Sequence, residues 1–355
     1  MPVDACLALV MAAVSAALVS LGLVGYVRRV ALRHRILDAP NERSLHSQPT
    51  PRGGGTAIVA VSLIGIWLCW ALLPLCSAQH LLSFIGAALL IAVVSWRDDV
   101  RPLPVLGRFG AHTLAAVVVV VGVGSWTVLE APGVGSLCLG YLGLPITFLW
   151  IVGLTNAYNF MDGIDGIAGS QAVVAGLGWV ALTWGSGHVE TWLGLLLAAA
   201  SLGFLVHNWP PAKIFMGDVG SAFLGFSFAA LAIIGARRDP RLALAGVLLV
   251  WPFVFDTSFT LLRRLRRGEN IFQAHRSHLY QRLVLAGFSH RFVTCLYGAL
   301  AVVGVALALM WEQRIGAASG LVPSALASAM IGLWLFVVWA ERRQETGGPI
   351  RTNAR

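Results

Sequence analysis

The stretch Asn156-Ala157-Tyr158-Asn159-Phe160-Met161-Asp162-Gly163-Ile164-Asp165-Gly166 decides how this chain is organised. It places two amides and two carboxylates at the end of an apolar run that starts at residue 142. Charged groups are costly in hydrocarbon, and the usual reason to keep them at a membrane span is a site for ions or polar substrates. We therefore expect a polar site at the end of a transmembrane helix.

The composition is that of a membrane protein. Of the 355 residues 57% are hydrophobic and only 12% are charged, whereas soluble proteins have about 25% charged residues. The apolar runs are continuous rather than alternating, which favours helices over a β-barrel. The sequence predicts an all-α polytopic integral membrane protein, with a single transmembrane domain over residues 1–341 and a cytoplasmic tail over 342–355.

Eleven apolar runs are candidate spans, at about 20 residues for each crossing. The third and eighth runs are short, and Pro252 interrupts the ninth. The runs cover residues 7–27, 56–75, 81–95, 109–124, 142–158, 167–184, 191–206, 221–235, 242–262, 292–310 and 322–340.

The basic residues predict the orientation. With the N-terminus outside and the C-terminus cytoplasmic, 21 of the 25 Lys and Arg residues fall inside, as the positive-inside rule requires. The net charge of +9 is then a consequence of topology, and we expect no nucleic-acid partner. The same orientation puts five polar segments on the cytoplasmic side, which predicts one cytoplasmic site: residues 52–55, 98–99, 156–166, 208–221 and 275–282.

Carboxylates are the first candidates for chemistry. Adjacent carboxylates such as Asp98 and Asp99 repel, so one can serve as a base or metal ligand; the alternative is interfacial charge or a helix cap. Asp162 and Asp165 are three residues apart, which puts both on one side of a helix or turn and suits Mg²⁺. The alternative there is an interfacial turn without function. Asp218 directly precedes a span and could also ligate Mg²⁺.

Basic and aromatic residues accompany these carboxylates. Lys213 could hold a phosphate or simply snorkel to the interface, and Phe215 could stack on a base. His275 and His278 lie beside Arg276 with no third metal ligand nearby, so they suit a diphosphate or sugar better than zinc. Arg52 precedes three glycines, a pattern that fits either a phosphate-binding loop or a plain turn.

Together these segments resemble the polyprenyl-phosphate N-acetylhexosamine-1-phosphate transferases, the family that includes the phospho-N-acetylmuramoyl-pentapeptide transferases. The matching segments occur in the family's order, from about residue 20 to 340. They are Pro51-Arg52-Gly53-Gly54, Asp98-Asp99, the stretch 156–166, Pro211-Ala212-Lys213-Ile214-Phe215-Met216-Gly217-Asp218 and His275-Arg276-Ser277-His278.

The resemblance implies an enzyme of the bacterial inner membrane with its active site on the cytoplasmic face. It would transfer a sugar 1-phosphate from a UDP-sugar to undecaprenyl phosphate and release UMP, with Mg²⁺, or Mn²⁺ in its place, as cofactor. A one-step displacement and a covalent Asp intermediate both fit. A homodimer is compatible with the sequence, which does not determine the oligomeric state.

The resemblance also implies roles for individual residues. Asp98, Asp99 and Asp218 are the expected catalytic residues, with Asp218 on the metal and Asp98 as base. Arg52 and Arg108 are expected at the lipid phosphate. The expected residues for the nucleotide and donor are Asn156, Asn159, Asp162, Asp165, Lys213, Phe215, His275, Arg276 and His278.

The donor sugar is open at this point. The form of the histidine segment looks like the branch that primes O-antigen and related polysaccharides, with UDP-GlcNAc or a 6-deoxy donor of the UDP-FucNAc or UDP-QuiNAc type. Asp256 stands where many members have Glu, and Arg108 where a Lys is frequent. The alternatives are a phospho-MurNAc-pentapeptide transferase of peptidoglycan synthesis and, from another class, an ion-coupled transporter.

Overall fold

The computed structural model describes residues 3–40, 45–46, 48–73, 75–270, 273, 275–313 and 320–347. Helices make up most of it, and two two-stranded antiparallel sheets are the only strands in this part of the chain. The helices are α1 (Val3–Arg33), α2 (Gly55–Leu72), α3 (Ala78–Val100), α4 (Val105–Gly122), α5 (Gly143–Phe160), α6 (Ile167–Leu182), α7 (Val189–Asn208), α8 (Asp218–Ala236), α9 (Arg241–Leu249), α10 (Trp251–Arg266), α11 (Leu279–Leu285), α12 (His290–Glu312) and α13 (Val322–Gly347). The strands are β1 (Leu37–Asp38), β2 (Thr50–Pro51), β3 (Val128–Ala131) and β4 (Gly135–Cys138), and a 3₁₀ turn, η1 (Gly140–Leu142), precedes α5.

The prediction of an all-α polytopic membrane protein is confirmed. Within the described residues, nine helices are long and apolar enough to cross a membrane. Helices α9 and α10 qualify as a tenth span when taken as one, with a bend of 77° at the break. Pro252 lies at the start of α10 and cannot donate an interior helical hydrogen bond, so the chain breaks where the sequence predicts. The eleventh expected span falls on α6, which is apolar but has only 16 residues.

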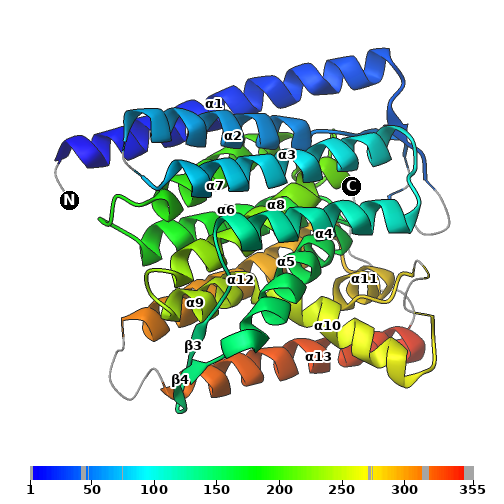
Figure 1. Cartoon of the computed structure of the whole chain (residues 1–355). Coiled ribbons are helices and arrows are strands. Elements are labelled where there is room, and N and C mark those ends of the chain that lie inside the picture. Colours follow the sequence, from blue (N-terminus) through cyan, green and yellow to red (C-terminus); the bar gives the residue numbers. More distant parts are fainter. Residues whose placement is uncertain are drawn as a thin grey trace.

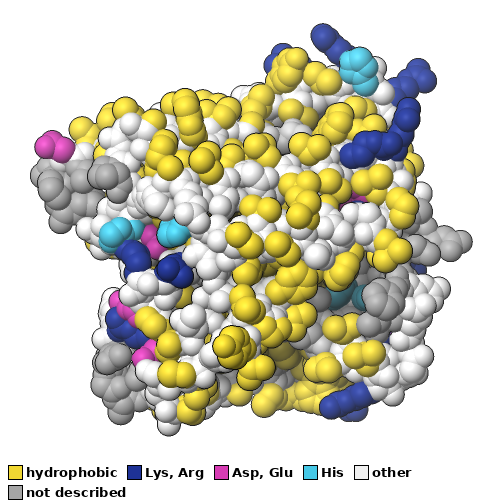
Figure 2. Space-filling model, in the orientation of Figure 1, with side chains coloured by type: hydrophobic (Ala, Val, Ile, Leu, Met, Phe, Trp, Pro, Cys, Tyr) yellow, Lys and Arg dark blue, Asp and Glu magenta, His cyan; other side chains and the backbone are white. Residues whose placement is uncertain are grey.

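The helices run roughly alongside one another, with α1 and α13 at opposite edges of the bundle (Figure 1). Helices α7 and α8 are the most buried spans, whereas α1 and α13 expose most of their surface. Figure 2 shows hydrophobic side chains spread over the visible face, with Lys and Arg gathered beyond the end of α1. An apolar outer surface around a packed centre is what lipid as solvent requires.

The two ends of the bundle are built differently. One end carries the β1–β2 pair, α11 and the C-terminal part of α13, where Glu341 forms an ion pair with Arg282 of α11. The β3–β4 hairpin and α9 lie at the other end, where α1 begins (Figure 1). Helix α13 continues to Gly347, so part of the segment expected as a tail is helical, while Arg314 and residues 348–355 lie outside the described residues. The expected orientation, domain boundary and homodimer stay predictions.

Two glycines bring the first helices of the site together. A Cβ placed on Gly220 would lie 2.6 Å from the Cα of Gly55, so α2 and α8 cross there in backbone contact. Small residues allow such close packing between membrane helices. Beside this crossing, the N–H groups of Gly54 and Gly55 donate to the carbonyl oxygens of Phe215 and Met216. The crossing places the loop that carries Arg52 against the start of α8.

Candidate active site

The N-terminus of α8 is capped by a side chain from α3. The Asp99 carboxylate accepts hydrogen bonds from the backbone N–H groups of Asp218 (2.9 Å) and Val219 (3.1 Å). The first N–H groups of a helix have no partner within the helix, and its dipole favours negative charge there. Gly217 makes the close approach possible, with a φ of +79° and no Cβ to collide with Asp99. Asp99 therefore positions Asp218, and its expected catalytic role stays a prediction.

Arg52 joins two of the expected catalytic carboxylates. Its Nη2 lies 2.7 Å from an oxygen of Asp99 and 2.9 Å from an oxygen of Asp218. Buried carboxylates at these distances raise the pKa of Arg52 above its ordinary value, although burial acts in the opposite direction. The guanidinium therefore remains charged and offsets part of the negative charge at the site.

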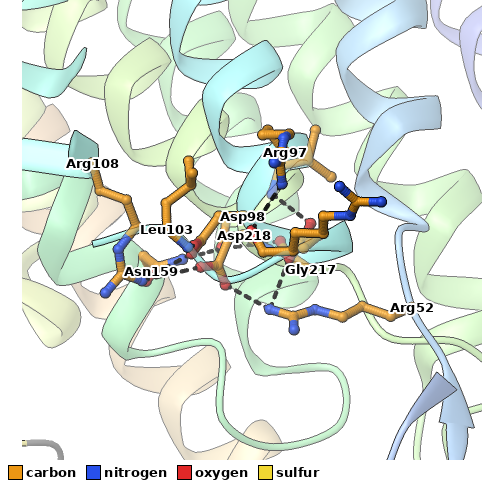
Figure 3. A network of polar contacts seen from close by, with 12 residues as sticks. Arg52, Arg97, Asp98, Leu103, Arg108, Asn159, Gly217 and Asp218 are labelled. Atoms are coloured by element: carbon orange, nitrogen blue, oxygen red, sulfur yellow. Dashed lines mark hydrogen bonds and ion pairs between the residues drawn. The ribbon is translucent and has the colours of Figure 1, made fainter. Parts of the chain in front are cut away.

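A second arginine approaches from α4. Nη1 of Arg108 lies 3.0 Å from Asp98 and 3.6 Å from Asp218, and Asp98 also accepts a hydrogen bond from the N–H of Leu103. Figure 3 shows Asp218 between the two arginines, which reach it from different sides. The two arginines expected at the lipid phosphate, Arg52 and Arg108, therefore form ion pairs with the expected catalytic carboxylates.

Asp218 also lines a cavity of about 180 Å³. Asn159 lies on its wall and donates a 2.9 Å hydrogen bond to Ser221 in α8. The described residues that line the cavity are Asp38, Leu45, His46, Arg52, Asn159, Asp162, Gly163, Ile164, Asp165, Asn208, Phe215, Gly217, Asp218, Gln281 and His290. Polar groups from widely separated segments therefore meet in one concave site, as small-molecule sites require.

The cavity carries more carboxylate charge than its arginines neutralise. Burial and the neighbouring carboxylates Asp218 and Asp99 raise the pKa of Asp162 well above its ordinary range, against the effect of Arg52. No three acidic, His or Cys side chains of the described residues are gathered as a ready-made metal cage. Mg²⁺ is commonly held by one or two carboxylates together with substrate phosphates. The oxygen-rich part of the cavity lining around Asp218 and Asp162 fits that mode of binding.

Asp165 is occupied by structural contacts. One of its carboxylate oxygens accepts from the N–H of Ala212 at 3.0 Å, and the other lies 3.4 Å from Nδ1 of His290. Its backbone carbonyl accepts from the hydroxyl of Thr294 in α12. Asp162 and Asp165 therefore differ in surroundings despite their spacing, and Asp165 holds three segments together at the cavity wall.

The histidine segment is anchored by Asp256, which is fully buried. The carboxylate accepts from the N–H groups of Leu279 (2.8 Å) and Tyr280 (3.0 Å) and from the hydroxyl of Tyr297 (2.6 Å). Nδ1 of His278 lies 3.3 Å from the same carboxylate. Asp256 therefore caps α11 and sets the orientation of the His278 ring.

His275 packs against His278, with 4.9 Å between the ring centroids. Burial, helped by the neighbouring His278, lowers the pKa of His275 to about 4. At neutral pH the His275 ring is therefore uncharged.

Five expected donor residues are not among the described residues that line the cavity: Asn156, Lys213, His275, Arg276 and His278. Asn156 donates to the carbonyl of Val152 within α5. Lys213 and Arg276 are exposed, and the N–H of Lys213 donates to the carbonyl of His207 at 2.8 Å. Their expected roles stay predictions.

Four lining residues lie outside every segment that the sequence singled out: Asp38, Leu45, His46 and His290. Two more, Asn208 and Gln281, lie within the segments 208–221 and 275–282 but were not expected as site residues. Asn208 illustrates the reason. Its side chain accepts from the N–H of Gly166 and donates to the carbonyl of Ile214, so it joins two motifs of the site. The position of Asn208 at the end of a span, next to two prolines, was the available clue.

The comparison with known proteins shows the family to which the chain belongs. The family model described as glycosyl transferase family 4 matches residues 81–236. A probable undecaprenyl-phosphate N-acetylglucosaminyl 1-phosphate transferase of Bacillus subtilis is 33% identical over 270 residues, covering 75% of this chain and 74% of that protein. The chain belongs to glycosyl transferase family 4. It is therefore a membrane-embedded transferase, and this assignment replaces the ion-coupled transporter alternative.

Two further relatives of this family 4 transferase differ in the sugar that their names give. A decaprenyl-phosphate N-acetylglucosaminephosphotransferase of Mycobacterium tuberculosis is 32% identical over 344 residues, with 87% of this chain and 85% of that protein covered. A phospho-N-acetylmuramoyl-pentapeptide-transferase of Synechococcus is 33% identical over 287 residues, with 76% and 81% covered. Similar identities to both types leave the donor to be determined by experiment.

Proposed function

We propose that the chain transfers a HexNAc 1-phosphate from a UDP-sugar to undecaprenyl phosphate or a similar polyprenyl phosphate, and releases UMP. The observation that carries this proposal is the position of Asp218 between Arg52 and Arg108 at a polar cavity on a helix N-terminus. Arginine side chains favour phosphates, and two phosphorylated substrates must meet in this reaction.

The reaction joins the lipid phosphate to the sugar-linked phosphorus of the donor. An oxygen of the lipid phosphate forms a bond to that phosphorus, the bond to the bridging oxygen breaks, and UMP leaves with the electron pair. Asp98 orients the attacking phosphate or takes its proton, and Arg108, 3.0 Å from Asp98, holds the phosphate. Such reactions depend mostly on positioning and charge neutralisation.

Asp218 would hold Mg²⁺. When bound, the ion would neutralise part of the negative charge of the donor's diphosphate. The raised pKa of Asp162, caused by burial and by the neighbouring carboxylates, supports a cation at this place. We expect a chelator to abolish turnover and added Mg²⁺ or Mn²⁺ to restore it. Full activity after exhaustive chelation would contradict a metal-dependent reaction.

The donor we put first is UDP-GlcNAc, because two of the relatives above are named for N-acetylglucosamine. Donors of the UDP-FucNAc or UDP-QuiNAc type come next, on the form of the His275–His278 segment, and the MurNAc-pentapeptide donor is the third. The product would prime O-antigen or another cell-envelope polysaccharide, and the site would face the cytoplasm of a bacterium.

The decisive experiment is a donor panel on purified protein with undecaprenyl phosphate and Mg²⁺. We expect release of UMP together with a lipid-diphosphate-sugar from one donor class. If no UDP-HexNAc or MurNAc-pentapeptide donor releases UMP, the proposed function is wrong. A product that forms without lipid phosphate would point to hydrolysis instead of transfer.

A further inference from the structure

Tyr280 joins two segments of the site from behind the cavity wall. Its side chain is fully buried, and its hydroxyl donates a 3.0 Å hydrogen bond to the carbonyl oxygen of Phe160. Phe160 is the last residue of α5, and the last carbonyl groups of a helix have no partner within that helix. A side chain of α11 therefore completes the end of α5, which lies 120 residues earlier in the chain.

Gly163 is matched in size to this hydroxyl. A Cβ placed on Gly163 would overlap the hydroxyl oxygen of Tyr280. The φ of Gly163 is not positive, so an alanine could adopt the same backbone conformation. The space taken by Tyr280, rather than the backbone conformation, therefore requires glycine at this position.

Tyr280 is itself held by helices that lie outside this wall. Its N–H donates to the buried carboxylate of Asp256 in α10 at 3.0 Å. Its ring packs edge-on against Tyr297 of α12, with 6.4 Å between the ring centroids. The hydroxyl therefore has a position fixed by α10, α11 and α12, and the chain that rests on this hydroxyl is placed by those helices.

The turn 160–164, which rests on Tyr280, forms part of the cavity. Asp162, Gly163 and Ile164 line the cavity from this turn, and Gln281 lines it from α11. Tyr280 is not among the described residues of the lining, so its effect on a ligand must pass through the turn. The hydroxyl thus sets the position of one part of the wall relative to another.

We propose that Tyr280 is a positioning residue whose hydroxyl holds the turn 160–164 at the separation from the histidine segment that the donor requires. This inference rests on the proposed function for the identity of the donor. A donor that contacts both segments binds well only when their separation is correct, and small displacements of positioning groups have large effects. The lipid phosphate is expected at Arg52 and Arg108 instead, so its binding should not depend on Tyr280.

The first test removes the hydroxyl with Tyr280→Phe. Binding of UMP is measured by calorimetry on purified protein, which requires no turnover, and steady-state kinetics give KM for the donor and for the lipid phosphate. We expect UMP binding to weaken and the donor KM to rise by about 3- to 10-fold, the effect of one lost hydrogen bond. The lipid KM and kcat should stay close to the wild-type values. Tyr141→Phe, at an exposed position in η1, is the matched control and should behave as the wild type.

The second test uses the fit between Gly163 and Tyr280. Gly163→Ala should weaken UMP binding by at least about 10-fold, because the added methyl group displaces the turn. Combining it with Tyr280→Phe removes the overlapping oxygen, so the double variant should bind UMP about as well as Tyr280→Phe alone. Gly153→Ala in α5, where nothing lies within 4 Å, is the control for an added methyl group. If Gly163→Ala does not fold, recovery of folded protein in the double variant replaces the binding measurement.

Two results would overturn the inference. One is wild-type UMP affinity and donor KM in Tyr280→Phe, whatever its melting temperature, which would leave the hydroxyl a purely structural role. The other is independence of the two substitutions, so that their effects on UMP binding multiply in the double variant. Failure of the proposed function would instead appear as absence of turnover with every donor, while the coupling between Gly163 and Tyr280 could still be measured by thermal unfolding.

Discussion

At the scale of single residues, Asp218 stands out because two arginines and a helix N-terminus all act on one carboxylate. Arg52 and Arg108 approach its two oxygens at 2.9 and 3.6 Å. The sequence predicted a metal ligand at this position from the carboxylate before a span. It did not predict that Asp99, 119 residues away in the chain, would hold that helix end.

Asp218→Asn should reduce kcat by at least about 100-fold, because it removes a charge on which the reacting groups depend. The amide is nearly isosteric, so the melting temperature should change little. Asp4→Asn, at an exposed position near the start of α1, is the matched control. Turnover within a few-fold of the wild type would remove Asp218 from the chemistry.

At the scale of elements, helix α11 depends on one buried side chain from α10. Asp256 accepts from two N–H groups at the start of α11 and from Tyr297 in α12. The sequence singled out Asp256 only as a departure from a frequent Glu. Its function as a cap became visible only in the folded chain, where α10 and the start of α11 lie in contact.

Asp256→Ala should lower the free energy of unfolding by about 3 kcal/mol or more, because three donors lose a charged acceptor in a buried place. Hydrogen exchange should increase first in α11 and the His275–His278 segment. Thermal unfolding in detergent with mass-spectrometric exchange measures both. Uniform exchange across the chain, with no local increase in α11, would contradict the anchoring role.

The crossing of α2 and α8 is a second element-scale feature. Gly220→Ala would place a methyl group 2.6 Å from the Cα of Gly55, so the helices must separate. We expect a loss of about 1–3 kcal/mol in stability and a larger loss of activity, because Arg52 moves away from Asp218. Gly298→Ala in α12, where nothing lies within 4 Å, is the control and should be neutral or slightly stabilising.

At the scale of the whole molecule, the polar residues of the candidate site lie at one end of the helix bundle. The polar motifs of five segments meet at the end near α11, and the β3–β4 hairpin lies at the opposite end (Figure 1). A catalytic site near the midplane would have needed charges deep in the bundle. This arrangement suits an enzyme whose water-soluble and lipid substrates meet at the membrane surface.

The expected orientation can be tested with Cys138, which is exposed in β4. If the site faces the cytoplasm, a membrane-impermeant thiol reagent added to intact spheroplasts should label Cys138. Cys138→Ser is the control for labelling at other cysteines. Labelling that appears only after lysis would reverse the orientation.

The sequence by itself determined the membrane class, the order of the spans and the residues of the chemical motifs. Hydropathy and composition reflect the free energy of placing each segment in lipid, which depends on local sequence. The sequence also predicted that the polar motifs lie on one side of the membrane, because the number of spans and the placement of basic residues determine the side of each loop.

The tertiary structure alone decided which groups meet. Arg52 and Asp218 are 166 residues apart, and their ion pair exists because glycines let α2 and α8 touch. Likewise, Asp165 and Asp162 look equivalent in sequence, yet one is committed to structural hydrogen bonds and the other is not. Tyr280 was not expected as a site residue until folding placed its hydroxyl against Gly163. Such pairings depend on how helices pack, and packing is a property of the whole fold, with no trace in local periodicity.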